Sequence, residues 1–195
     1  MIIYEINKLK PLEKVFPNHL SILSNMIKSS TKVLSPIIAD KETGIILDGS
    51  HRYIFFLKEG YLTVPVKLID YKDEHIRVGT HLMHRHIIDS DPGISKNEVI
   101  KRGLTGNTYP PRTTRHFFPF RKNVNANVNL SDLLKGDPVD VSKYIANVSI
   151  EHEINHNLNY LDEIDFEMDE IIKYLDEIRM TKLYLKNQIK AMRKQ

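Results

Sequence analysis

Alternating and clustered apolar positions predict a small mixed sheet in the front part of the chain. Residues 2–6 alternate between apolar and polar side chains, which predicts a first strand. The short apolar runs 37–39 and 45–47 predict two further strands, joined by a turn rich in polar residues. Residues 64–71 predict another strand, and Pro65 favours a place at the edge of the sheet or at a strand beginning.

Helical periodicity predicts the elements that flank this sheet. Apolar residues three and four apart predict an amphipathic helix over 17–29. Ser95 and Glu98 form a capping box, which predicts a helix that ends at Gly103. A short helix is expected over 130–134, before a Gly-Asp-Pro sequence.

A strand–turn–helix unit over 45–60 stands at the centre of the predicted body. The turn 48–50 follows a β-branched run and precedes an apolar helical face that closes at Gly60. Glycine in the turn permits close approach of a ligand, and the first helical turn leaves N–H groups unpaired. His51 and Arg52 stand at the same turn, and arginine can bind a phosphate or carboxylate with two hydrogen bonds. The unit is therefore either an anion site or an ordinary supersecondary unit with a surface arginine.

Two further segments carry side chains that could bind a ligand or a metal ion. Residues 109–120 combine prolines, hydroxyls, arginines and phenylalanines, which is typical of a binding loop and equally of a surface loop anchored by its phenylalanines. Residues 74–88 contain the four histidines His75, His81, His84 and His86. This cluster could hold a metal ion, but a polar segment is favoured because no further acidic or cysteine ligand accompanies it.

From Ile154 onward an unbroken heptad pattern predicts a long coiled-coil helix. Its first apolar positions are Ile154, Leu161, Met168, Leu175 and Ile189, with Lys182 as the exception. Its second apolar positions are Ile164, Ile171, Ile178, Leu185 and Met192, with Asn157 as the exception. The charged residues of 151–177 are acidic except Lys173, and those of 178–195 are all basic, which suits the helix dipole and an antiparallel pairing of two chains. We expect self-association through 151–195.

Composition narrows the class of protein. The 195 residues are 41% hydrophobic and 27% charged, as in ordinary globular proteins. The chain has no cysteine, which excludes disulfides and thiolate chemistry and is consistent with the cytoplasm. No apolar run is long enough to span a membrane, and the beginning does not have the pattern of a signal peptide. The net charge of +3 does not by itself favour nucleic acid.

The segment 37–71 resembles the ParB/sulfiredoxin superfamily, whose members bind a nucleotide phosphate with a G-x-x-R turn. The turn here is Asp48-Gly49-Ser50-His51-Arg52-Tyr53. Sulfiredoxin needs a cysteine where Ser50 stands, so its activity is not implied. ParB partition proteins carry more arginines in the turn and a helix-turn-helix domain behind it, and neither is evident here.

A second motif is similar to the archaeal ADP-dependent free L-serine kinases. It spans 95–120 and ends in Pro111-Arg112-Thr113-Thr114-Arg115-His116-Phe117-Phe118-Pro119-Phe120. The start of those kinases resembles Leu9-Lys10-Pro11-Leu12-Glu13, and a siderophore-type serine kinase shares the D-G-x-H-R-Y turn. In the middle, a short segment replaces an additional lobe of the kinases. The C-terminal helix lies outside the resemblance.

The resemblance implies a role for each matching residue. Glu13 would be the base that takes the proton of the acceptor hydroxyl, and Asp48 would act beside it, helping to hold magnesium or to orient the acceptor. The nucleotide phosphates would bind to Asp48, Gly49, Ser50, His51 and Arg52. The amino-acid substrate would contact His81, Thr113, Thr114, Arg115 and His116. The implied cofactors are Mg²⁺ and ADP or ATP, and no residue is assigned as a dedicated metal ligand.

Together these observations predict an α+β fold with a ParB/sulfiredoxin-like small mixed sheet, flanking helices and a long C-terminal coiled-coil helix. The expected division is a catalytic or nucleotide-binding domain over 1–122, a linker with a short helix over 123–150, and the oligomerising helix over 151–195. The expected function is transfer of a phosphoryl group from ADP or ATP to free L-serine or a similar amino acid. The alternative is a non-catalytic ParB-like nucleotide-binding module with a regulatory or assembly role. Nucleic-acid binding ranks lowest, because no helix-turn-helix is evident and the basic stripe 179–194 suits an acidic partner helix.

Overall fold

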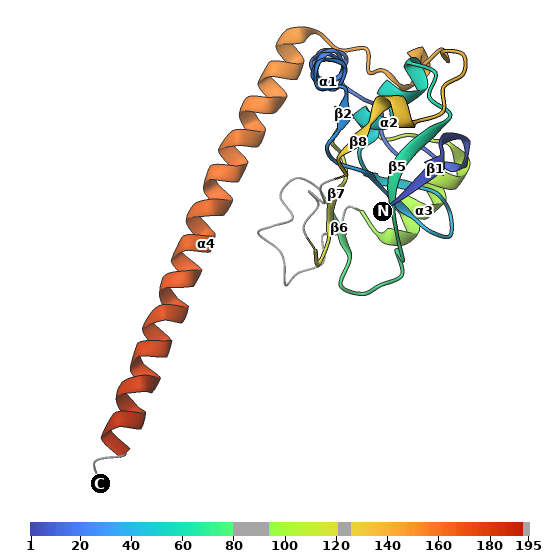
Figure 1. Cartoon of the computed structure of the whole chain (residues 1–195). Coiled ribbons are helices and arrows are strands. Elements are labelled where there is room, and N and C mark those ends of the chain that lie inside the picture. Colours follow the sequence, from blue (N-terminus) through green and yellow to red (C-terminus); the bar gives the residue numbers. More distant parts are fainter. Residues whose placement is uncertain (80–93, 121–125, 193–195) are drawn as a thin grey trace.

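Four strands form the central sheet, in the order β1–β5–β3–β4 (Figure 1). The structure is a computed structural model and describes residues 1–79, 94–120 and 126–192. The strands are β1 (Ile2–Glu5), β3 (Ile37–Asp40), β4 (Ile46–Asp48) and β5 (Thr63–Ile69). β1 and β4 run antiparallel to their neighbours, whereas β3 and β5 are parallel, so the sheet is mixed as the sequence predicts.

Of the two places predicted for Pro65, the structure shows the strand beginning and not the edge of the sheet. β5 lies inside the sheet, between β1 and β3. The registered pairs with β3 begin only at Val66, so Pro65 precedes that ladder and faces a registered partner, Ile3, on the β1 side alone. Proline is tolerated because it stands near the strand beginning, where its missing N–H interrupts no pair with β3.

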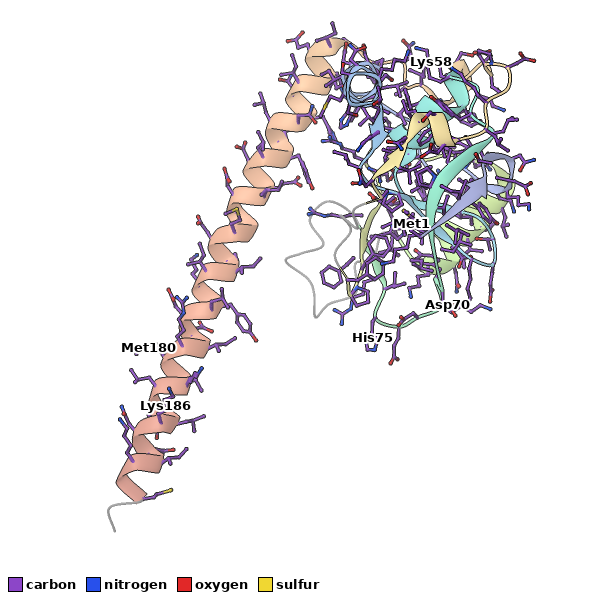
Figure 2. All side chains as sticks on the ribbon, in the orientation of Figure 1. Met1, Lys58, Asp70, His75, Met180 and Lys186 are labelled. Carbon is purple, nitrogen blue, oxygen red and sulfur yellow. The ribbon has the colours of Figure 1, made fainter. Side chains whose placement is uncertain are left out.

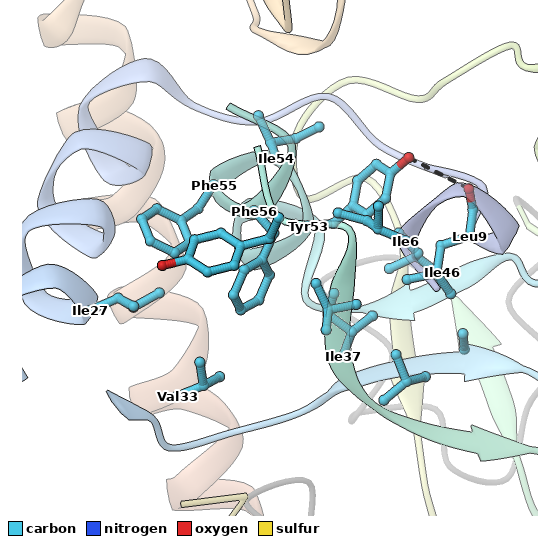
Figure 3. Packing of buried hydrophobic residues seen from close by; sticks show 14 of the residues in the cluster. Ile6, Leu9, Ile27, Val33, Ile37, Ile46, Tyr53, Ile54, Phe55 and Phe56 are labelled. Carbon is cyan, nitrogen blue, oxygen red and sulfur yellow. Dashed lines mark hydrogen bonds between the residues drawn. The ribbon is translucent and has the colours of Figure 1, made fainter. Parts of the chain in front are cut away.

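The predicted flanking helices are α1 (Pro17–Ser30) and α2 (Ser50–Lys58), and they pack against each other over the core. α2 follows β4 directly after Gly49. Its Ile54, Phe55 and Phe56 are almost fully buried. Figure 3 shows these side chains between Ile27 of α1 and the strand residues of the sheet. Burial of large apolar side chains is the main source of stability here.

The helix α3 (Lys96–Thr105) begins as predicted but ends later. The Ser95 hydroxyl accepts a hydrogen bond from the Glu98 backbone N–H at 3.2 Å, which is the expected cap. The predicted end at Gly103 is wrong, because the left-handed cap is Gly106 with φ 71°. Gly103 is instead an interior helical residue whose missing side chain lets Ile45 pack against the helix.

Segments far apart in sequence complete the body with small pairings. β2 (Lys32–Val33) pairs with β8 (Val128–Asn129), and β6 (Arg77–Gly79) pairs with β7 (Arg115–Phe117). Among the described residues the single-turn helices are η1 (Ile6–Lys8), η3 (Leu130–Asp132) and η4 (Ser142–Tyr144). The short helix predicted over 130–134 is thus a 3₁₀ turn.

The segment 126–149, which the sequence suggests is a linker, packs on the body. Leu133 and Val141 are buried in the same core cluster as the central sheet. The backbone of Ala146 donates to the Val15 carbonyl at 2.9 Å. The segment therefore fixes the start of the next helix against the body.

The helix α4 (Ile150–Met192) is a single element of 43 residues. Its first turns lie against α1, and the rest extends away from the body (Figure 1). Along this extension the labelled Met180 and Lys186 lie far from the other elements (Figure 2). In the part of the chain that the structure describes, no helix has both the length and the apolar character needed to cross a membrane.

Candidate functional site

One cavity of about 340 Å³ lies where five segments of the chain converge. The segment around Glu13, the helix α1, the β4–α2 turn, the loop before β7 together with β7 itself, and the first turns of α4 all contribute to it. Its lining residues are Glu13, His19, Leu23, Leu47, Asp48, Gly49, Ser50, His51, Arg52, Arg112, Thr114, Arg115, His116 and Tyr160. The two motifs that the sequence singles out therefore face a common space.

The α2 end of the cavity is a helix N-terminus. Gly49 caps it with φ 101°, a conformation that side chains disfavour. A Cβ at this position would lie 2.9 Å from Nη2 of Arg52. Glycine thus serves both the backbone turn and the close packing of the arginine. The unpaired N–H groups of the first turn and the helix dipole make this end favourable for an anion.

Arg52 is held in place by two acceptors. Its Nη2 donates to Oδ2 of Asp48 at 3.0 Å and to the carbonyl of Pro36 at 3.1 Å. Its side chain is only partly exposed. An arginine fixed in this way keeps its positive charge at the α2 N-terminus without the entropic cost of ordering it on binding.

Glu13 is one of the two acidic residues that line the cavity. Its Oε1 accepts hydrogen bonds from the backbone N–H and the hydroxyl of Thr114, the latter at 2.7 Å. Burial raises the pKa of Glu13 from its ordinary 4.5 to about 7, although the Thr114 and Arg112 hydrogen bonds act in the opposite direction. Near neutral pH this carboxyl is therefore poised between accepting and releasing a proton.

His51 and His19 form a stacked pair on one wall. Their ring centroids lie 4.3 Å apart at 30° between planes. The backbone N–H of Phe16 donates to Nε2 of His51 at 3.1 Å, which places the proton of the neutral ring on Nδ1. Burial, followed by the nearby charges of His19, Arg112 and Arg52, lowers the pKa of His51 to about 3. The ring is uncharged under ordinary conditions.

The first turns of α4 contribute Tyr160 to the cavity lining and hold Arg112 beside the histidine pair. The guanidinium of Arg112 donates to Oδ1 of Asn157 at 2.6 Å and lies 3.2 Å from Nδ1 of His19. The guanidinium carbons of Arg112 and Arg115 lie 5.5 and 5.4 Å from the centre of the Tyr160 ring. Two positively charged guanidinium groups therefore lie near the Tyr160 ring, beside the cavity.

Glu153 fixes the first turns of α4 to α1. Its carboxylate accepts hydrogen bonds from the backbone N–H groups of Asn18 and His19, at 3.1 and 2.7 Å, and from the Asn18 amide. α1 begins after Phe16 and has no side-chain cap of its own. Glu153 thus supplies the cap from 135 residues away, at the helix end where negative charge is favoured.

The loop residues named from the second motif divide into two groups. Thr114, Arg115 and His116 line the cavity, and the buried His116 lies with Nε2 2.9 Å from the Tyr71 hydroxyl. Thr113 does not line it; its hydroxyl donates to the Pro110 carbonyl, and it borders a neighbouring hollow. His81 lies outside the described residues.

Sequence reasoning missed three lining residues, His19, Arg112 and Tyr160. Arg112 lies inside the second motif, so its residue type and position could have identified it as a site residue. His19 and Tyr160 belong to helices whose patterns show only amphipathic or heptad character. Asn157, which breaks the heptad, was the single local hint that the first turns of α4 serve another purpose.

For a divalent cation the cavity offers two carboxylates. The described residues contain no group of three or more acidic or histidine side chains arranged to hold a metal ion. Mg²⁺ is commonly held by one or two carboxylates together with substrate phosphates and water. Asp48 and Glu13, both lining the cavity, fit that pattern. The histidines His81, His84 and His86 lie outside the described residues.

Comparisons of sequence place part of the chain beside two archaeal proteins. Over 83 residues it is 35% identical to an ATP-dependent L-serine kinase of Staphylothermus marinus, covering 40% of this chain and 33% of the kinase. Over 73 residues it is 40% identical to a ParB-like protein of Sulfolobus acidocaldarius, covering 36% of this chain and 35% of that protein. The matches thus span about a third of the length of these relatives. No family model matches the chain.

Solved structures extend the likeness to the fold. A free serine kinase in complex with ADP matches with a TM-score of 0.59 at 18% identity, covering 68% of this chain and 93% of that one. The truncated SbnI of Staphylococcus aureus matches with a TM-score of 0.55 at 15% identity, covering 84% and 96%. The resemblance expected from the motifs is confirmed: the chain has the fold of the free serine kinases and shares part of its sequence with an L-serine kinase and a ParB-like protein.

Proposed function

We propose that the protein is a small-molecule kinase that transfers a phosphoryl group from ATP or ADP to the hydroxyl of free L-serine or a similar amino acid. One observation carries the proposal: a buried carboxyl, a helix N-terminus with a fixed arginine, and a second arginine line the same cavity. Phosphoryl transfer depends mainly on positioning and on neutralising charge, and these groups supply both.

The nucleotide phosphates would bind at the start of α2. The N–H groups of Ser50 and His51 and the guanidinium of Arg52 provide donors and positive charge there. His51 contributes as a neutral ring, because its low pKa keeps it uncharged. Mg²⁺, held by Asp48 and the phosphates, would neutralise charge on the transferred group.

The amino acid would bind between Glu13 and the loop before β7. Arg115 pairs with its carboxylate, while Thr114 holds Glu13 toward the hydroxyl. In the transfer, Glu13 takes the hydroxyl proton as the serine oxygen forms its bond to phosphorus. The bond to the leaving nucleotide oxygen breaks, and ATP leaves as ADP, or ADP as AMP. Thr113 and His81 remain assigned to the substrate side by resemblance alone.

The test is formation of O-phosphoserine by the purified chain with L-serine, Mg²⁺ and either nucleotide, followed by mass spectrometry. Glu13→Gln keeps the size of the side chain but removes the base, so we expect a rate lowered by about 10²- to 10⁴-fold. Glu42→Gln, at an exposed carboxylate paired with Lys72, is the matched control and should retain the wild-type rate. Absence of product from wild type with both nucleotides would overturn the proposal.

The similarity to a ParB-like protein favours one alternative, a nucleotide-binding module without catalysis. Nucleotide would then raise the apparent melting temperature, because a ligand that binds only the native state stabilises it. L-serine would add no further shift, and no phosphoserine would form. A combined shift with both ligands, together with product, separates the kinase from this module.

A further inference from the structure

Beyond its contact with the body, α4 carries an apolar face that the described residues leave about half exposed. The root of the helix is occupied, since Glu153, Asn157 and Tyr160 bind α1 and the cavity arginines. Among the heptad positions from Leu161 to Met192, only Ile164 is half-buried. The others are exposed, and Leu175 and Ile178 are each 45% exposed. A long apolar stripe on a soluble helix marks an interaction surface.

We propose that this face binds α4 of a second copy of the chain in antiparallel orientation. The heptad allows registers that differ by seven residues, and we choose the one that places every heptad position from Leu161 to Met192 opposite another. The opposed pairs are Leu161 with Met192, Ile164 with Ile189, Met168 with Leu185, Ile171 with Lys182, and Leu175 with Ile178. Each pair occurs twice, as a two-fold interface requires.

Charge selects this orientation over the parallel one. A parallel pair would place Lys182 opposite its own copy in the seam and the acidic half of each helix beside the other acidic half. The antiparallel pair places Lys182 opposite Ile171, and the mostly acidic charges of 163–174 beside the basic 179–190. It also places the positive end of each helix dipole beside the negative end of the other.

The same register creates a specific ion pair at the flank of the seam. Asp165 falls beside Lys186 of the second copy, and the symmetry repeats the contact. Lys186 lies on the free part of α4, far from the body (Figure 2). Within the described part of the chain neither side chain makes an ion pair, whereas Arg179 is paired with Asp176 of its own helix.

The pairing face begins beside the body contact. Tyr160 lines the cavity, and the next residue, Leu161, is the exposed first position of the pairing face. Asn157 breaks the heptad one turn earlier and binds Arg112 instead. The half-buried Ile164 lies at the boundary, and from Met168 onward every heptad position is exposed. This inference is independent of the chemistry in the cavity.

Light scattering on the full chain tests the association, with an expected mass of twice 22.7 kDa. D165K should weaken the dimer by about tenfold in dissociation constant, because it replaces two attractive contacts by two repulsive ones. K186D should do the same, and the double variant should restore the wild-type value. A monomeric wild type, or a double variant weaker than both single variants, would overturn the proposal.

Cysteine cross-linking tests the orientation, since the chain has no cysteine of its own. In the antiparallel register, oxidation should join L161C to M192C in a mixture of the two single variants. Each variant alone should stay unlinked, because its cysteine faces an unmodified residue. Efficient cross-linking of either variant alone would refute the antiparallel register. Circular dichroism on each variant checks that α4 remains helical.

Discussion

The raised pKa of Glu13 predicts a measurable change in stability with pH. The folded protein keeps the proton of this carboxyl up to about pH 7, whereas the unfolded chain loses it near 4.5. Between these values the native state binds more protons than the unfolded state, so this group lowers the free energy of unfolding as pH rises. The full difference corresponds to about 3 kcal/mol, of which about 2 to 3 kcal/mol falls between pH 5 and pH 8.

Glu13→Gln isolates this effect, because the amide does not ionise and retains an acceptor for the Thr114 hydroxyl. The pH dependence of wild-type stability alone does not reveal the effect of Glu13, because His51 changes the free energy of unfolding in the opposite direction. Its lowered pKa makes the unfolded chain bind the extra proton, so its contribution to stability increases from about pH 3 toward pH 6.5. His51 is common to both proteins, and its effect cancels in the difference between the two curves.

Urea unfolding followed by circular dichroism at several pH values supplies the two curves. We expect the stability of the glutamine variant relative to wild type to rise by about 2 kcal/mol or more from pH 5 to pH 8. For Glu42→Gln, at an exposed ion pair, the difference in unfolding free energy from wild type should not change with pH. A flat difference for Glu13→Gln would show that the carboxyl ionises normally, and the argument for a base with a pKa near 7 would fail.

The remaining predictions concern two long-range contacts of the fold. Glu153→Ala should lower the free energy of unfolding by about 1 to 2 kcal/mol by removing the cap of α1, whereas the exposed Glu151→Ala should have little effect. Gly103→Ala should destabilise by about 1 to 3 kcal/mol, because a Cβ there would lie 2.6 Å from Ile45, and thermal unfolding would record the loss. An unchanged melting temperature in either variant would contradict the packing described.

Local pattern alone was enough to predict most of the elements. The periodicity of apolar residues predicts α1, the hairpin of β3 and β4, and the long α4, since each arises from contacts close in sequence. The turn at Gly49 is likewise local, because a left-handed residue before a helix favours glycine. Resemblance of two motifs also predicted which loop faces this turn.

Only the tertiary structure decided which distant groups meet. Thr114 binds Glu13 across 101 residues, and Glu153 caps α1 across 135. The wrong helix end has the same origin: Gly103 was interpreted by a local rule, while its surroundings are set by Ile45 of a distant segment. Side-chain type and spacing determine which elements form. The burial of a side chain depends on which elements the chain brings together, and the raised pKa of Glu13 follows from that burial.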